Sequence, residues 1–186
     1  PIVIDPVGVS GSSYRREKCL ELMKIIHPTC IRGNYSEIQA LLHNCGTVTG
    51  VDAAEDALAE AEETDLPELM KQYAKENQMI LVASGETDLI TDGSCVYRCH
   101  NGSPMMARIT GSGCMSTVML GAFLSAENSV ESAVACCAFT GIAGELAAKE
   151  MTAQKRGTMT FRNWFIDAVS LMTPEQLEHG TNVDWF

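Results

Sequence analysis

The stretch PTCIRGNYSEI, residues 28–38, passes from a strand pattern to a helix pattern without a linker. Its first part, Thr29–Ile31, follows a proline and is largely β-branched or apolar, which predicts a short strand. Asn34 and Glu37 then have the N-cap to N3 spacing of a capping box, which predicts that a helix begins here. A strand that leads directly into a helix is the building unit of α/β folds.

The same alternation extends in both directions from this stretch. Before it, Ile2–Ile4 predicts a strand and Tyr14–Ile26 predicts a helix with apolar residues at helical spacing. After it, residues 53–77 predict a helix interrupted at Asp65–Pro67, and Met79–Ala83 is an apolar run typical of a strand buried on both faces. We therefore expect an α/β protein with a mainly parallel central sheet covered by helices on both faces.

Turn signals divide the next part of the chain into short strands. Asp92-Gly93 and Asn101-Gly102 separate the segments Leu89–Thr91, Val96–Arg98 and Met105–Ile109, and this spacing predicts a β-meander. Longer apolar segments then predict three helices, of which the last closes the chain: Cys114–Leu124, Ser129–Lys149 and Trp164–Leu171.

Composition and charge restrict the classes of function. With 46% hydrophobic and 20% charged residues, the 186-residue chain can build a core and is not of the disordered type. Its net charge of −11 opposes binding to a nucleic-acid backbone, although a few amides and one arginine can still hold a small anion. No apolar run reaches the ~18–20 residues of a membrane span, so we expect no membrane association.

The eight cysteines are expected to be free thiols. A chain of this size builds a core without disulfides, and Cys136 and Cys137 fall in an Ala-rich helical stretch where cysteine acts as a small apolar residue. Cys95 and Cys99 are four positions apart, but no second pair with zinc spacing follows them. We therefore expect no zinc site and a reducing, cytoplasmic location.

The strongest local signal for chemistry is Thr110-Gly111-Ser112-Gly113-Cys114, which stands between a predicted strand and a predicted helix. Glycines let a ligand approach the backbone closely, and successive amides at a helix N-terminus can bind an anion. Cys114 is then expected in the first turn of that helix. The alternative from these residues alone is a simple turn followed by a structural cysteine.

Four further side chains are predicted at the ends of strands. Asp5 could bind Mg²⁺ through water, Arg32 could reach a phosphate, and Glu37 could hold a metal-bound water. The hydroxyl of Ser84 follows the apolar strand. Three of these residues have plainer alternatives: a turn cap for Asp5, a surface side chain for Arg32, and a helix-capping glutamate for Glu37. Because the carboxyl ends of parallel strands meet at one edge of a sheet, the set as a whole suits Mg²⁺-dependent phosphoryl transfer without a Walker sequence.

Several sequence blocks occur in a fixed order along the chain: D-P-V-G at Asp5–Gly8, P-T-x-I-R-G-N-x-S-E-I at residues 28–38, T-G-E-x-D at Ser84–Asp88, x-D-G at Thr91–Gly93, T-G-T-G-C-M at Thr110–Met115, and the helix around Gly141–Glu145. These blocks and their order resemble those of the hydroxyethylthiazole kinases, which have a ribokinase-like fold. The resemblance covers most of the chain and implies the three-layer fold of that family.

The resemblance implies ATP-dependent phosphorylation of the hydroxyl group of 4-methyl-5-(2-hydroxyethyl)thiazole, with Mg²⁺, in thiamine biosynthesis or salvage. Carried over block by block, it implies that Arg32 and Ser84 contact ATP and that Gly111 contacts the thiazole. Asp5 and Glu37 would hold Mg²⁺, through water.

The resemblance also implies catalytic groups in the glycine loop. The amides from Gly111 to Cys114, including that of Gly113, would neutralise charge on the transferring phosphoryl group. Related sugar kinases have an aspartate general base where this family has cysteine. Cys114 is therefore the candidate for assisting deprotonation of the substrate hydroxyl.

The chain departs from the family pattern in three places. Ser84 and Ser112 stand where the family has threonine. Ser84 keeps the hydroxyl that would contact ATP, and Ser112 leaves the backbone amides of the glycine loop in place. The family also has a considerable N-terminal section before its D-P-V-G block. We therefore expect residues 1–186 to form a single ribokinase-like kinase domain that lacks its N-terminal portion. For the complete protein the resemblance implies a homotrimer with active sites between subunits.

Two other functions stay open at this point. A kinase of the hydroxymethylpyrimidine type has the same fold and a glycine loop that ends in cysteine, although the I-R-G-N-x-S-E block argues against it. A chain that keeps only the nucleotide-binding part would bind ATP without turnover. Measuring turnover with a panel of acceptors distinguishes these functions.

Overall fold

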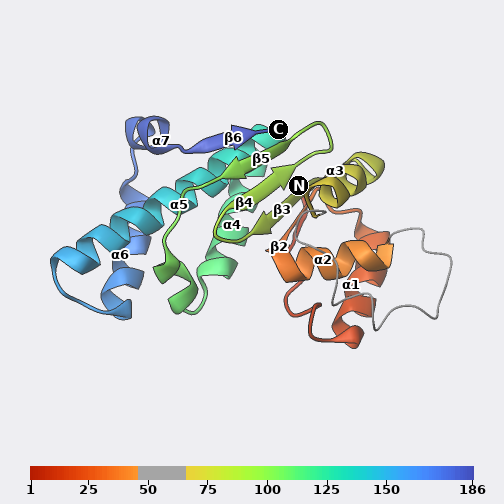
Figure 1. Cartoon of the computed structure of the whole chain (residues 1–186), viewed down its shortest axis with the longest axis horizontal. Coiled ribbons are helices and arrows are strands. Elements are labelled where there is room, and N and C mark those ends of the chain that lie inside the picture. The colour runs from red at the N-terminus through yellow and green to blue at the C-terminus, as the bar shows by residue number, and fades with distance from the viewer. Residues whose placement is uncertain (46–65) are drawn as a thin grey trace.

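The computed structural model of the chain describes residues 1–45 and 66–186 and contains one six-stranded sheet (Figure 1). The strands follow one another in space in sequence order: β1 (Val3–Ile4), β2 (Cys30–Asn34), β3 (Ile80–Ser84), β4 (Asp88–Thr91), β5 (Val96–Cys99) and β6 (Val183–Trp185). The first three strands are parallel, and β4, β5 and β6 are added by antiparallel pairing. The sheet is therefore mixed, with its parallel part at the N-terminal side.

Helices cover both faces of this sheet, as the sequence predicts. On one face lie α1 (Ser13–Ile26), α2 (Tyr35–Cys45) and α3 (Leu66–Asn77); on the other lie α4 (Ser112–Ala126) and α5 (Val130–Ala153). Two further helices follow along the chain, α6 (Thr158–Leu171), which packs on α5, and α7 (Pro174–Gly180). In Figure 1, α1 to α3 gather beside the first strands, and α5 and α6 extend away from them.

Alternate residues of the central strands pack into two separate hydrophobic cores. Ile31 and Leu81 pack with residues of the first three helices, whereas Cys30 and Val82 pack with residues of α4 and α5. Successive side chains of a strand point to opposite faces of a sheet, so a strand covered on both faces must be apolar throughout. The expectation of a doubly buried strand at residues 79–83 is confirmed by β3.

The capping box predicted at the start of α2 is present. The Asn34 side-chain Oδ1 accepts from the Glu37 backbone amide at 2.9 Å, and Glu37 Oε2 accepts from the Asn34 amide at 2.9 Å. Two backbone donors that have no partner within the helix are thus satisfied. This reciprocal pair fixes the turn from β2 into α2 at the edge of the sheet.

The predicted third strand of the meander is wrong. Residues Pro104–Arg108 form a 3-10 helix, η3, capped by the Ser103 hydroxyl, which accepts from the Met105 amide at 3.3 Å. Proline has no N–H to donate to a strand partner and its fixed φ favours the start of a helix, which explains the difference. The antiparallel extension is completed instead by β6.

The end of the chain also differs from the prediction, because α7 and β6 follow the helix that we expected to be last. Both elements are too short for periodicity to identify them. Of the helix predicted over residues 53–77, the structure describes α3; residues 53–65 lie outside the described part.

Small residues allow α5 to pack closely against the chain that follows β5. A Cβ atom added at Gly141 would come within 2.5 Å of the Asn101 backbone, and one added at Gly144 would come within 2.5 Å of Met106 Sδ.

Within the described residues, α5 is the one helix that is long and apolar enough to cross a membrane. In the structure, 61% of its most apolar 18-residue stretch is buried against the rest of the protein.

Candidate active site

A cavity of about 720 Å³ lies where β2, β3 and β4 meet the start of α4 and the middle of α5. Three of the predicted site residues line it, namely Arg32, Ser84 and Gly113. Its other walls come from β4, from the segment between β5 and η3, and from α5. The structure thus brings the predicted arginine, hydroxyl and glycine loop to one cavity.

The glycine loop forms the N-terminus of α4. Gly111 is the N-cap residue and has φ of +94°, a left-handed conformation that favours glycine. The first intrahelical bond joins the Met115 amide to the Gly111 carbonyl oxygen at 2.9 Å. The amides of Ser112, Gly113 and Cys114 therefore precede the first intrahelical hydrogen bond, a position from which helix amides can bind an anion.

Arg32 joins the sheet to this loop. Its Nη1 donates to the Gly113 carbonyl oxygen and to Thr117 Oγ1, both at 3.3 Å, and Thr117 Oγ1 donates to Asp5 Oδ2 at 2.8 Å. The ends of β1 and β2 are thus connected to the first turns of α4. Thr117 is not among the predicted site residues, although its position one helical turn after Gly113 places it on the same side of α4.

Glu37 is buried and is held by the backbone. Its Oε1 accepts from the Gly8 amide at 2.8 Å, while Oε2 accepts from Asn34 as part of the capping box. This carboxylate therefore fixes the loop after β1 against the start of α2. No hydrogen bond joins it to Asp5, and in the described part of the chain no three His, Cys, Asp or Glu side chains form a group that could hold a metal.

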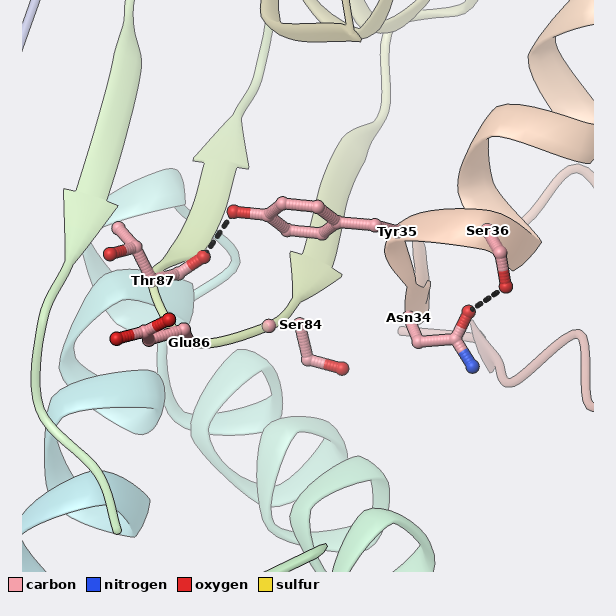
Figure 2. Close-up of a pocket in the computed structure, with 7 residues that line it drawn as sticks. Asn34, Tyr35, Ser36, Ser84, Glu86 and Thr87 are labelled. Atoms are coloured by element: carbon pink, nitrogen blue, oxygen red, sulfur yellow. Dashed lines mark hydrogen bonds between the residues drawn. The ribbon is translucent and has the colours of Figure 1, made fainter. Parts of the chain in front are cut away.

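The loop Ser84–Thr87, which we call the SGET loop, separates the large cavity from a second one of about 520 Å³ at the start of α2 (Figure 2). Ser84 Oγ donates to the Gly33 carbonyl oxygen at 3.2 Å, and the Tyr35 hydroxyl donates to the Thr87 carbonyl oxygen. Figure 2 shows the Tyr35 ring reaching across from α2 to the end of this loop. The loop is therefore held on both sides.

Asp88 lies directly after the SGET loop and has no role among the predicted site residues. Its Oδ1 accepts from the Gly85 amide at 3.0 Å. Burial raises the pKa of Asp88, while the Gly85 amide and the Arg32 charge act in the opposite direction. The floor of the cavity thus contains a carboxyl group that is costly to ionise.

The cysteines near this floor are structural. Burial raises the pKa of Cys136 to about 11 and that of Cys137 well above its ordinary value, so both remain protonated at neutral pH. The seven cysteines whose side chains are described are free thiols. Within the described residues, Cys95 and Cys99 belong to no metal-binding group.

Cys114 is exposed and faces a different hollow from its neighbour Gly113. It lines an apolar groove of about 370 Å³ between α4 and α6. The remaining lining residues are Met115, Val118, Met119, Phe165, Ile166 and Val169. The first turn of α4 thus separates a polar cavity from an apolar groove, and two consecutive residues face the two sides.

Comparison with known proteins identifies one family. The sequence model of the hydroxyethylthiazole kinase family matches residues 1–175. Hydroxyethylthiazole kinase 1 of Methanosphaera stadtmanae is 38% identical over 91% of this chain and 62% of its own length, and the hydroxyethylthiazole kinase of Staphylococcus carnosus is 34% identical over 99% of this chain and 67% of its own.

A solved structure, that of a hydroxyethylthiazole kinase protein from Pyrococcus horikoshii OT3, matches with a TM-score of 0.82 and 26% identity. The match covers 100% of this chain and 65% of that protein. The chain therefore spans about two thirds of the length of the relatives it matches.

Proposed function

Because the chain belongs to the hydroxyethylthiazole kinase family, we propose that it transfers the γ-phosphoryl group of ATP to the hydroxyl group of 4-methyl-5-(2-hydroxyethyl)thiazole. This is a step of thiamine biosynthesis or salvage. The observation that carries the proposal is the position of Gly113 and Cys114. One faces a cavity with an arginine and free amides, and the other faces an apolar groove, so a phosphoryl donor and an apolar acceptor can meet at the start of α4.

ATP occupies the large cavity in this proposal. Its phosphates lie against Arg32, the Ser84 hydroxyl and the amides that precede the α4 ladder, since a guanidinium and a helix N-terminus both attract anions. Phosphoryl transfer depends mainly on positioning and charge neutralisation, which these groups supply. To meet phosphate, the Arg32 guanidinium exchanges its two contacts of 3.3 Å for shorter charge-assisted bonds.

The acceptor lies at the apolar groove, with the amide of Gly111 and the thiol of Cys114 nearest its hydroxyl group. A thiazole ring with a methyl group is largely apolar and suits a groove lined by methionine, valine and phenylalanine. Cys114 assists removal of the hydroxyl proton, and the Gly113 amide stabilises the charge on the phosphoryl group in flight.

Asp5 and Glu37 are the residues that would hold Mg²⁺ through water. Carboxylate oxygens are the ligands that Mg²⁺ prefers, and Asp5 accepts from Thr117 through only one of its two oxygens, Oδ2. Glu37 already accepts two backbone amides, so it fits an outer position better than direct ligation. When bound, Mg²⁺ neutralises charge on the triphosphate.

The complete protein is proposed to be a cytoplasmic homotrimer. The free thiols of the described residues agree with a reducing location. Because the resemblance implies active sites between subunits, the exposed Val118 and Ile166 at the acceptor groove would lie next to a neighbouring subunit.

A panel of acceptors tests the proposed reaction. With ATP and Mg²⁺ in a coupled ADP-release assay, we expect turnover that requires hydroxyethylthiazole and is absent with a hydroxymethylpyrimidine or its phosphate. Turnover with the pyrimidine alone would assign the chain to the alternative vitamin-kinase activity. ATP binding without turnover on any acceptor would leave a nucleotide-binding module.

A further inference from the structure

The last strand of the sheet reaches the candidate nucleotide cavity through a line of side-chain contacts. The family model ends at residue 175, whereas β6 spans Val183–Trp185. Asp184 on β6 lies opposite Arg98 on β5, and its Oδ2 is 2.9 Å from His100 Nε2. The segment that follows the end of the family model is thus attached to a histidine that lines the cavity.

The same histidine also contacts the SGET loop. His100 Nδ1 lies 3.2 Å from Thr87 Oγ1, so the ring joins Thr87 on one side to Asp184 on the other. A carboxylate only accepts hydrogen bonds, so Nε2 carries a proton and donates to Asp184. In the neutral ring Nδ1 then accepts from the Thr87 hydroxyl, which gives a directed chain from the loop to β6.

Asp184 is well suited to orient this ring. His100 first, and then Arg98, holds the pKa of Asp184 below its ordinary value, so the carboxylate stays ionised at neutral pH. The Arg98 guanidinium bonds to the other oxygen, Oδ1, at 2.5 Å. Each Asp184 oxygen therefore has its own partner, and the one that faces His100 is not shared with the arginine.

The SGET loop is thus held from two directions. Tyr35, at the start of α2, holds the Thr87 carbonyl oxygen, and His100, directly after β5, holds the Thr87 hydroxyl. Ser84, at the other end of this loop, lines the large cavity together with Gly85 and Glu86. Displacement of Thr87 would therefore move a loop that forms the wall between the two cavities.

We infer that Asp184 is a positioning residue for nucleotide binding, which acts by holding His100 against Thr87 so that the SGET loop is preformed for ATP. The inference rests on the proposed function, since it assumes that the large cavity takes ATP. A preformed loop avoids the loss of conformational freedom on binding. The role of Asp184 therefore concerns ATP affinity and leaves the chemical step unchanged.

The test measures the dissociation constant for ATP with Mg²⁺ by calorimetry on the whole chain. We expect Asp184→Ala and Thr87→Val each to weaken ATP binding by about 3- to 10-fold, the range of one hydrogen bond. The double variant should be no weaker than either single one, because both changes break the same chain of contacts. Asp184→Asn keeps an acceptor for His100 and should bind within about 2-fold of the wild type.

Arg98→Gln is the matched control. It removes the other partner of the same carboxylate and leaves the contact between Asp184 and His100 in place. Wild-type ATP affinity in this variant, beside weakened binding in Asp184→Ala, supports the inference. Equal weakening in both variants, additive effects in the double variant, or unchanged affinity in Asp184→Ala would overturn it.

The two proposals fail in different ways. If the wild-type chain binds no ATP, the proposed function and this inference fall together. If the wild type binds ATP and Asp184→Ala binds it equally well, the inference alone is overturned. Where turnover is measured, the KM for ATP should rise in Asp184→Ala while kcat stays within about 2-fold of the wild type.

Discussion

Arg32 Nη1 on β2 donates to the carbonyl oxygen of Gly113 on α4 at 3.3 Å, although 81 residues separate the two in the chain. This contact brings the cation at the end of a parallel strand to the amides of the glycine loop. The large cavity opens beside it, lined by both residues. A positive charge and oriented backbone amides, placed side by side, are the groups that bind a triphosphate.

Replacing Arg32 should weaken ATP binding strongly. Arg32→Gln removes the charge, and hydrogen bonds to charged groups contribute about 1.5–3 kcal/mol, so we expect the dissociation constant for ATP to rise by about 10- to 100-fold. Calorimetric titration measures this change. Arg162→Gln, at an exposed position on α6, is the control and should bind ATP as the wild type does. Equal affinity in the two variants would place the phosphates elsewhere.

Cys114→Ala should lower kcat far more than it weakens ATP binding, because the thiol faces the apolar groove and not the large cavity. General acid–base groups contribute about 10²- to 10⁴-fold to rate, so a fall in kcat of at least about 10²-fold is expected. Steady-state kinetics with both substrates provide the measurement, with the partly buried Cys95 changed to alanine as control. An unchanged kcat would remove Cys114 from the mechanism.

Gly111→Ala tests the left-handed N-cap of α4. No atom lies within 4 Å of a Cβ added there, so the cost arises from the φ of +94° and should be about 1 kcal/mol of unfolding free energy. Activity should fall as well, because the loop amides turn away from the phosphoryl group. Chemical unfolding and kinetics are the two measurements.

Gly157→Ala is a matched control for this change. Gly157 is also an N-cap residue with open space around its Cβ position, but its φ is −110°. Alanine should therefore be tolerated there with no loss of stability. Equal losses in the two variants would show that the backbone conformation of Gly111 is not the cause.

Glu37→Gln should destabilise the fold by about 1–2 kcal/mol, because a neutral amide offers one acceptor oxygen to the two backbone donors Gly8 and Asn34. Thermal unfolding measures the loss. Glu68→Gln, in the first turn of α3, is the control and should change stability by no more than about 0.5 kcal/mol. A neutral effect of Glu37→Gln would contradict the structural role assigned to this carboxylate.

The partly buried Asp88 should make stability depend on pH. Its pKa in the folded protein lies above the ordinary value of 3.8, so its contribution to stability is fully present below that value and is lost as pH rises through the folded pKa. Asp88→Asn should remove this loss, and its stability relative to the wild type should increase between about pH 3 and about pH 7. Urea unfolding of both proteins across this pH range measures the difference in their unfolding free energies. A difference that does not change with pH would contradict the prediction.

Local signals predicted much of the fold and of the site. The capping box at Asn34 and Glu37, the apolar run of β3 and the glycine loop are defined by neighbouring residues, and each was found where expected. By contrast, β6 is three residues long and gains its place from pairing with β5, a contact that no local pattern encodes.

The residues that the sequence analysis missed act through long-range contacts. Thr117 joins Arg32 to Asp5, and His100 joins Thr87 to Asp184, across separations in the chain that only the fold can close. Glu37 was predicted as a holder of Mg²⁺ from its motif alone. In the structure both of its carboxylate oxygens accept hydrogen bonds from backbone amides, which periodicity and spacing could not indicate.

The most direct test of the account is detection of the product itself. The purified chain is incubated with γ-³²P-labelled ATP, Mg²⁺ and hydroxyethylthiazole, and labelled thiazole phosphate is separated and counted. The account predicts labelled ester that forms with the wild type and falls sharply with Cys114→Ala. ATP bound with full affinity and no labelled ester after prolonged incubation would contradict transfer at the start of α4.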